Sequence, residues 1–111
     1  MKSLQPTEKE IQDNIIEYLR RKKWYVQRLN SGVYRLEKSL VRGVAAGTPD
    51  VMAFKRWGYG DNAHVHLLFV EVKRPGKKAT PLQLSKMSEL ARYGAKCLVA
   101  TCIEDLQKEG I

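Results

Sequence analysis

The 111-residue sequence has no apolar run that approaches the ~20 residues needed to cross a bilayer, so we expect no membrane association. It contains only two cysteines, too few for a disulfide scaffold, and no other Cys or His is spaced near them as a zinc site would require. Residues 1–6 lack the apolar core of a signal peptide, which favours an intracellular, cytoplasmic protein. Acidic residues are also scarce, with twelve Asp and Glu against twenty Lys and Arg.

This imbalance gives a formal net charge of +8, which favours a polyanionic partner, with nucleic acid the first choice. Apolar residues make up 43% of the chain, enough for a folded interior. No repeat, low-complexity tract or linker divides the sequence, so we expect residues 1–111 to form a single domain.

The spacing of apolar residues predicts an α/β fold in the order α-β-β-β-α-β, followed by a short last helix. The two long predicted helices cover residues 7–23 and 80–94, and the predicted strands cover 24–29, 51–54, 65–72 and 97–100. The apolar run at 97–100 is typical of a strand covered on both faces. Thr101 with Glu104 is expected to begin the short last helix. Residues 33–46 fit a basic loop or a ragged hairpin. The second helix should cross between two parallel strands, which gives a mixed central sheet flanked by helices.

Both long helices begin with a capping pattern. Thr7 is followed three residues later by Glu10, and Thr80 by Gln83, so each pair can exchange hydrogen bonds between side chains and backbone amides. Helical spacing also places Gln83 at the head of the apolar stripe that continues through Met87, which directs its side chain inward.

The residues that carry chemistry are two acids and a lysine. Asp50 begins one strand of a predicted hairpin and Glu71 ends the other, so both carboxylates can meet at one end of the sheet. Lys73 lies on the same strand face as Glu71. Two converging carboxylates suit Mg²⁺ or Mn²⁺, which can activate water against a phosphodiester, while Lys73 can orient that water or neutralise charge. Gly47 and Pro49 are expected to shape the turn that presents Asp50.

The ordinary alternative is a structural salt bridge between Glu71 and Lys73, which leaves Asp50, Gln83 and the basic charge unexplained. Seven basic residues are predicted to contact DNA phosphates: Arg28, Arg35, Lys38, Arg42, Arg74, Lys77 and Lys78. The basic run at 20–23 fits either phosphate contact or compensation of a helix dipole. His64 and His66 alternate on one strand and, without a third ligand, are not predicted to form a metal site.

These motifs together resemble the VRR-NUC branch of the PD-(D/E)xK nuclease superfamily. The resemblance extends over nearly the whole chain and rests on residues 7–12, 47–50 and 69–73, and on Gln83 with Leu90 seven residues later. It implies a restriction-endonuclease-like core in which Asp50, Glu71 and the Val72 carbonyl bind a divalent metal. It also implies that Lys73 is the catalytic lysine.

The same resemblance places a glutamine and a further acid beside the site. Gln83 corresponds to the glutamine, although its capping role is an equal alternative and both roles can coexist. Glu8 is the best match to the acid of the first helix, as a catalytic residue and metal ligand, with Glu10 and Gln12 as alternatives.

The resemblance implies a metal-dependent DNA endonuclease that cuts phosphodiester bonds by metal-activated water. Stand-alone members of the family act as homodimers on branched DNA such as four-way junctions, and the small size fits a phage origin and a role in DNA repair. A non-catalytic nucleic-acid-binding module, an inactive subunit of a larger assembly and a restriction-type nuclease stay open as alternatives.

Overall fold

The computed structural model describes residues 5–29, 33–36, 39–42 and 44–111, with 33–36 and 39–42 described by their backbone. Along the chain the elements are α1 (Glu8–Arg21), β1 (Tyr25–Arg28), β2 (Val33–Leu36), β3 (Ser39–Arg42), β4 (Val51–Trp57), the 3₁₀ turn η1 (Gly60–Asn62), β5 (His64–Val72), α2 (Pro81–Arg92), β6 (Lys96–Ala100) and α3 (Ile103–Gln107). None of the helices in these ranges is long and apolar enough to cross a membrane.

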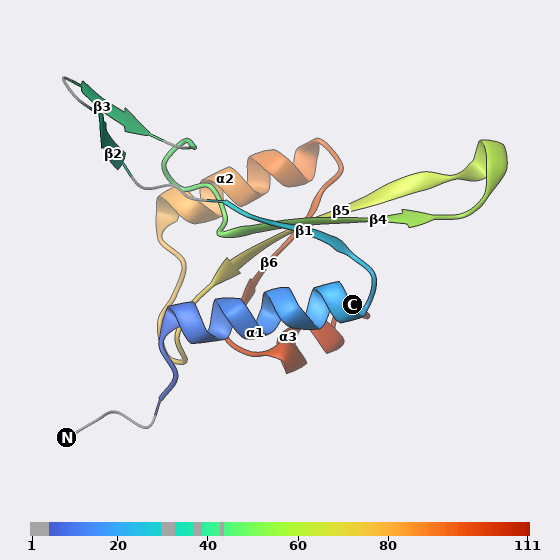
Figure 1. The fold of residues 1–111 in the computed structure, drawn as a ribbon, viewed down its shortest axis with the longest axis horizontal. Helices are drawn as coiled ribbons and strands as arrows, with labels where there is room; N and C mark the ends of the chain where they lie inside the picture. Colours follow the sequence, from blue (N-terminus) through green and yellow to red (C-terminus); the bar gives the residue numbers. More distant parts are fainter. Residues whose placement is uncertain (1–4, 30–32, 37–38, 43) are drawn as a thin grey trace.

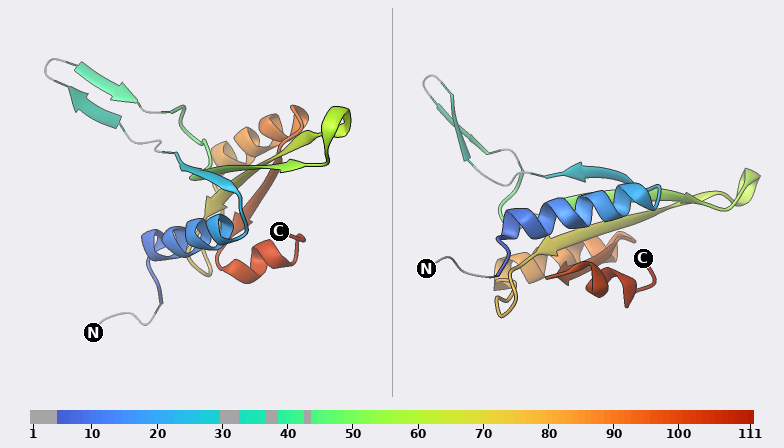
Figure 2. Two further views of the ribbon diagram at one scale, coloured as in Figure 1. Left: turned by 45° about the vertical axis from the view of Figure 1, so that its right-hand side comes forward. Right: turned by 60° about the horizontal axis from the view of Figure 1, so that its bottom comes forward.

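A mixed four-stranded sheet forms the centre of the molecule, in the order β1-β4-β5-β6. The first two pairings are antiparallel, and β5 pairs with β6 in parallel through the α2 crossover. Helices α1 and α3 lie on one side of the sheet and α2 on the other (Figures 1 and 2). This confirms the predicted restriction-endonuclease-like α/β architecture.

The hydrophobic core lies between this sheet and the pair α1 and α3. It includes Ile15 and Leu19 of α1 together with Val51, Leu68 and other buried strand residues, each almost wholly inaccessible. The buried positions of α1 recur every three to four residues, so the helix turns one apolar stripe toward the sheet. That stripe fixes α1 across the strands that carry the predicted acids.

The ends of the central hairpin differ in their surroundings. At one end, the N-terminus of α1 lies near the C-terminal end of β5, and the β2–β3 hairpin leaves the sheet from this side (Figure 1). At the other end, β4 and β5 extend past the helices to the turn at η1 (Figure 1). Both strands are longer than predicted, because pairing continues to the register Trp57 opposite His64.

The capping prediction is confirmed in full at α2 and, at α1, for the Thr7 side chain. The Thr7 hydroxyl accepts a hydrogen bond from the Glu10 amide at 3.1 Å. At α2 both halves of the box are formed: Gln83 N–H donates to the Thr80 hydroxyl at 3.2 Å, and the Thr80 amide donates to Gln83 Oε1 at 2.9 Å. Residues 33–46, left open between loop and hairpin, contain the antiparallel pair β2–β3 as a small sheet of its own.

Three local predictions need correction. Strand β6 is an edge strand, so its middle residues, including Cys97, are half-buried rather than covered on both faces. The last helix is capped at Cys102, and Asp105 rather than Glu104 accepts hydrogen bonds from the Thr101 amide and hydroxyl. Helical spacing also predicts Ala91 on the buried stripe of α2, but Ala91 is exposed.

The first helix is shorter than predicted because its C-terminal turn closes at Lys23. This residue has φ of +71°, and its amide and that of Trp24 bond back to the carbonyls of Arg20 and Leu19. Glycine usually occupies this left-handed position after a helix, because a Cβ is disfavoured there.

We therefore predict that Lys23→Gly raises the free energy of unfolding by about 0.5–1 kcal/mol relative to Lys23→Ala, measured by denaturant titration. Alanine is the matched control because it also removes the exposed amine but keeps the Cβ. Equal stabilities of the two variants would contradict this account of the helix end.

Candidate active site

Asp50 and Glu71 meet where the β4–β5 hairpin enters the body of the molecule. Val51 is paired with Val70, so Asp50, just before β4, lies opposite Glu71. The Asp50 carboxylate accepts a hydrogen bond from the Val72 amide at 2.8 Å, and the backbone carbonyl of Asp50 accepts one from the Leu29 amide at 2.7 Å. Neighbouring strands on both sides therefore fix the Asp50 backbone and side chain.

Glu71 is the one buried charged residue among those the structure describes, with 2% of its surface exposed. Burial, a side-chain hydrogen bond to Asp50 and the charge of Asp50 raise the pKa of Glu71 to about 8. Its Oε1 atom is buried and has no hydrogen-bond partner in the described part of the chain. Without a cation, this carboxyl group favours the folded state only while protonated, and that contribution is lost as pH rises through about 8.

Two further predicted residues act on Glu71 through charge. The Lys73 ammonium lowers the pKa of Glu71 and the Glu8 carboxylate raises it, so both groups lie in its electrostatic neighbourhood. The Lys73 backbone is fixed by its amide bond to the Ala100 carbonyl at 3.0 Å. Of the three candidates on α1, Glu8 is the one whose charge acts on Glu71, whereas the Glu10 amide serves the helix cap.

Gln83 begins α2 with its carboxamide oxygen committed to the capping box. Its side chain is half-buried, and the amide nitrogen takes no part in that box. This confirms the capping alternative for Gln83. A role of Gln83 beside the carboxylates stays a prediction, and the NH2 group that the capping box does not use permits it.

The turn before Asp50 is packed against the start of α2. Gly47 has φ of +85°, and a Cβ added there would lie 2.8 Å from the Leu82 side chain and 3.0 Å from its carbonyl oxygen. The Thr48 hydroxyl donates to the Ala45 carbonyl at 2.6 Å, and Pro49 is fully buried. A glycine is therefore needed both for its backbone conformation and for this close approach.

The predicted phosphate contacts fall into separate groups. Arg28 lies at the same end of the sheet as Asp50 and pairs with Asp13. Arg35 and Arg42 are on the β2–β3 hairpin, where only their backbone is described, and Lys38 lies outside the described residues.

The remaining basic residues follow Lys73 directly. The Lys77 amide donates to the Arg74 carbonyl at 3.0 Å, which closes a turn, and the side chains of Lys77 and Lys78 are exposed. The Arg74 guanidinium contacts Gln5 Oε1 at 3.4 Å, and its buried Nε has no partner within the described ranges. In the run at 20–23, Arg21 pairs with Glu17 within the last turns of α1.

The pair of carboxylates fits a divalent cation. Asp50 and Glu71 lie side by side, Glu8 adds a negative charge that acts on Glu71, and a buried oxygen of Glu71 lacks a partner among the described residues. Oxygen ligands of this kind suit Mg²⁺ or Mn²⁺, which retain several waters. The protein supplies few direct ligands, since no three His, Cys, Asp or Glu residues in the described ranges are arranged to hold one ion.

Sequence reasoning missed the contact between Gly47 and Leu82 and the link between Arg74 and Gln5. Both join segments far apart in the chain, and neither has a local sequence signal. The positive φ of Gly47 was foreseeable from its place in a turn, whereas the steric limit on its Cβ was not.

Comparisons with known proteins agree with this architecture. The VRR-NUC domain family model matches residues 6–103. A solved structure described as a VRR_NUC domain superposes with a TM-score of 0.64 and 22% identity, covering 91% of this chain and 90% of its own. Another, described as a VRR_NUC domain protein, has a TM-score of 0.57 and 24% identity, with 96% and 84% covered. A comparison with curated proteins gives no significant match.

The solved structures establish the likeness of fold, and the family match extends over most of the chain. The site and sheet define a protein with a restriction-endonuclease-like core. The chain belongs to the VRR-NUC family, which is a family of the nuclease type.

We predict that Gly47→Ala lowers the free energy of unfolding by about 1–3 kcal/mol more than Gly76→Ala, because only the former introduces overpacking. Gly76 is a matched control: its φ of +86° is almost that of Gly47, but a Cβ added there meets nothing within 4 Å. Denaturant unfolding of both variants measures the difference. Equal losses of unfolding free energy would show that the Leu82 side chain can move aside without destabilising the fold.

Proposed function

We propose that this protein is a divalent-metal-dependent DNA endonuclease in which Asp50 and Glu71 hold the ion. The observation that carries the proposal is a buried oxygen of Glu71, beside Asp50, that has no hydrogen-bond partner in the part of the chain that the structure describes. A structural salt bridge of Glu71 and Lys73 does not account for it, because that pairing leaves a second carboxylate next to the first. A cation shared by both acids removes the repulsion between them.

A bound Mg²⁺ or Mn²⁺ supplies a water of lowered pKa and neutralises charge on the phosphodiester. The expected ligands of this ion are Asp50, Glu71 and the Val72 carbonyl, and Glu8 is a further acid nearby. The Val72 amide already fixes the orientation of the Asp50 carboxylate, so little rearrangement is needed at the moment of binding.

The chain's own groups then position the substrate. Lys73, close enough to influence Glu71, is placed to hold the attacking water or to stabilise negative charge on the phosphate. The free amide group of Gln83 is suited to donate to the water or a phosphate oxygen. Neither residue needs to change its backbone, because β5 and the capping box fix both positions.

The expected DNA contacts surround this site. Arg74, which is half-buried, and the exposed Lys77 and Lys78 follow Lys73 in one turn, and the β2–β3 hairpin with Arg35 and Arg42 leaves the sheet from the same end (Figure 1). Lys38 and Arg28 belong to the same predicted set. A net charge of +8 adds a sequence-independent attraction to the phosphate backbone.

We further propose branched DNA, such as a four-way junction, as the substrate and a homodimer as the active species. One chain has one such site, and two symmetric cuts in a junction require two sites related by a two-fold axis. Within the described residues, β1 and β6 are the edges of the main sheet and are available for pairing between subunits.

The nuclease proposal predicts that Mg²⁺ or Mn²⁺ supports DNA cleavage that EDTA abolishes. Lys73→Ala and Asp50→Asn should each lower cleavage by at least about 100-fold, the first because it removes a positive charge that stabilises the transition state and the second because it removes a ligand of the ion. Affinity for DNA, measured by fluorescence anisotropy in Ca²⁺, should stay within a few-fold of the parent. A matched control is Lys86→Ala, which removes a lysine that pairs with Glu89 on α2.

Labelled four-way junction, flap, duplex and single-stranded DNA should be compared in the same assay. The proposal expects paired nicks in the junction and a solution mass of two chains. Binding of the junction without cleavage in either metal would favour the non-catalytic DNA-binding module instead. Preferential cleavage of one duplex sequence would favour the restriction-type alternative.

A further inference from the structure

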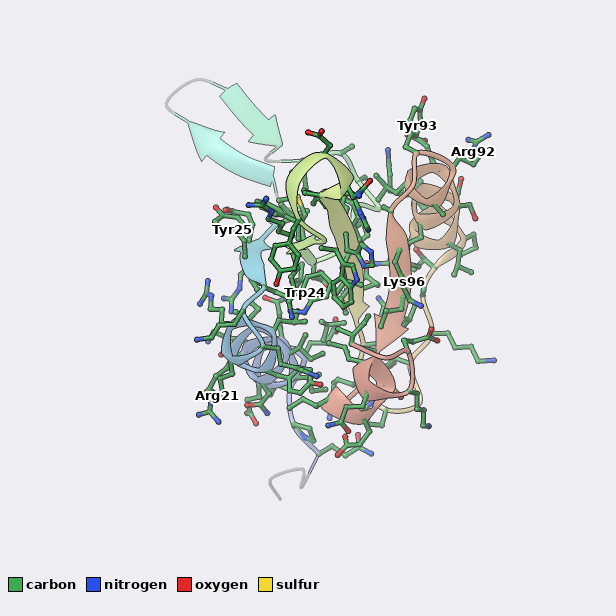
Figure 3. The ribbon with its side chains drawn as sticks, turned by 90° about the vertical axis from the view of Figure 1, so that its right-hand side faces the viewer. Arg21, Trp24, Tyr25, Arg92, Tyr93 and Lys96 are labelled. Atoms are coloured by element: carbon green, nitrogen blue, oxygen red, sulfur yellow. The ribbon has the colours of Figure 1, made fainter. Side chains whose placement is uncertain are left out.

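The two histidines of the chain meet at the far end of the β4–β5 hairpin from the carboxylates. His64 and His66 are exposed and share one face of β5, with their Nε2 atoms 3.2 Å apart. Figure 3 looks toward this end of the molecule, where Trp24 and Lys96 lie around the projecting hairpin. The proposed nuclease chemistry uses neither histidine.

We propose that His64 and His66 bind one borderline transition-metal ion of the Zn²⁺ class, with water in the remaining coordination positions. Two Zn–N bonds of about 2.0–2.1 Å spanning the 3.2 Å separation give an N–Zn–N angle of about 100–106°, close to tetrahedral. The imidazoles therefore already hold the separation that a chelated ion requires. Imidazole is also a preferred ligand for zinc, nickel and copper.

The Nδ1 atom of His64, which would not bind the metal, has the hydrogen-bond partner expected of a metal-binding histidine. Its Nδ1 lies 3.2 Å from the Asn62 carbonyl, which can only accept, so Nδ1 carries the proton and Nε2 presents a lone pair. In the metal-free state His66 Nε2–H donates to that lone pair. Binding requires only that the His66 proton move to its Nδ1, so no ligand has to be deprotonated overall.

The rings are also held in place by their surroundings. The indole of Trp57 stacks on His66 with ring centroids 4.8 Å apart and 7° between planes. Two cations are nearby, and both are engaged: Lys55 donates to the Lys22 carbonyl at 2.9 Å, and Lys96 pairs with Glu109 at 2.7 Å. The Glu109 carboxylate offsets the charge of Lys96, whereas the neutral Lys22 carbonyl only fixes the position of the Lys55 ammonium.

This site is distinct from the carboxylate pair in position and chemistry. Glu71 lies five residue steps along β5 from His66, which corresponds to about 17 Å. The carboxylates favour Mg²⁺ or Mn²⁺, whereas imidazole nitrogens favour Zn²⁺. Because no third His, Cys, Asp or Glu joins the pair in the described part of the chain, the site is open, with coordination positions left for water.

Titration of the protein with ZnCl₂ tests the proposal by calorimetry at about pH 7.5 in excess Mg²⁺, which occupies the carboxylates. The parent for all variants carries Cys97→Ser and Cys102→Ser, because both thiols are free and bind zinc themselves. We expect one Zn²⁺ per chain, with His64→Ala and His66→Ala each weakening binding by at least about tenfold.

Val65→Ala is the matched control, since Val65 lies between the two histidines, is 60% exposed and should leave zinc affinity unchanged. The imidazole NMR signals provide an independent readout, because the chain has only two histidines. Both rings should shift at their Nε2 atoms on adding Zn²⁺. Unchanged imidazole signals, or equal zinc affinity in the parent and both histidine variants, would overturn the proposal.

Discussion

The rest of the candidate site depends on one unfavourable arrangement, a buried glutamate placed beside an aspartate. Burial and the Asp50 charge raise the pKa of Glu71 to about 8, and one of its oxygens has no partner among the described groups. A buried carboxylate without a compensating charge is costly, so structures retain one where a proton or a cation neutralises it. The hairpin register, the Val72 amide and the Gly47 turn all serve to hold this pair together.

Much of this was predictable from the sequence, because the decisive constraints are local. A hairpin places the residue before its first strand opposite the end of its second, which brings Asp50 to Glu71. The capping pattern at Thr80 correctly gave the start of α2 and the position of Gln83. The order of helices and strands was sufficient to predict the parallel pairing of β5 and β6 through a crossover helix.

The features that the sequence does not predict depend on contacts between distant segments or on distances that a sequence pattern does not give. The closeness of Gly47 to Leu82 has no local signature, and neither has the edge position of β6. The spacing His-x-His shows that two rings share a strand face, but only the structure gives 3.2 Å between their nitrogens. The roles of Glu8 and Gln83 in catalysis stay predictions for the same reason.

The most direct test of the central claim is thermal unfolding of the parent and Glu71→Gln with and without Mn²⁺. If the two carboxylates bind a cation, Mn²⁺ raises the midpoint temperature of unfolding of the parent, because an ion that binds the folded state stabilises that state. The midpoint of the Glu71→Gln variant should not change. The metal-free variant should also be more stable than the metal-free parent near neutral pH, because Glu71 must take up a proton on folding and glutamine does not. No Mn²⁺ effect on the parent, together with a less stable variant, would contradict the account.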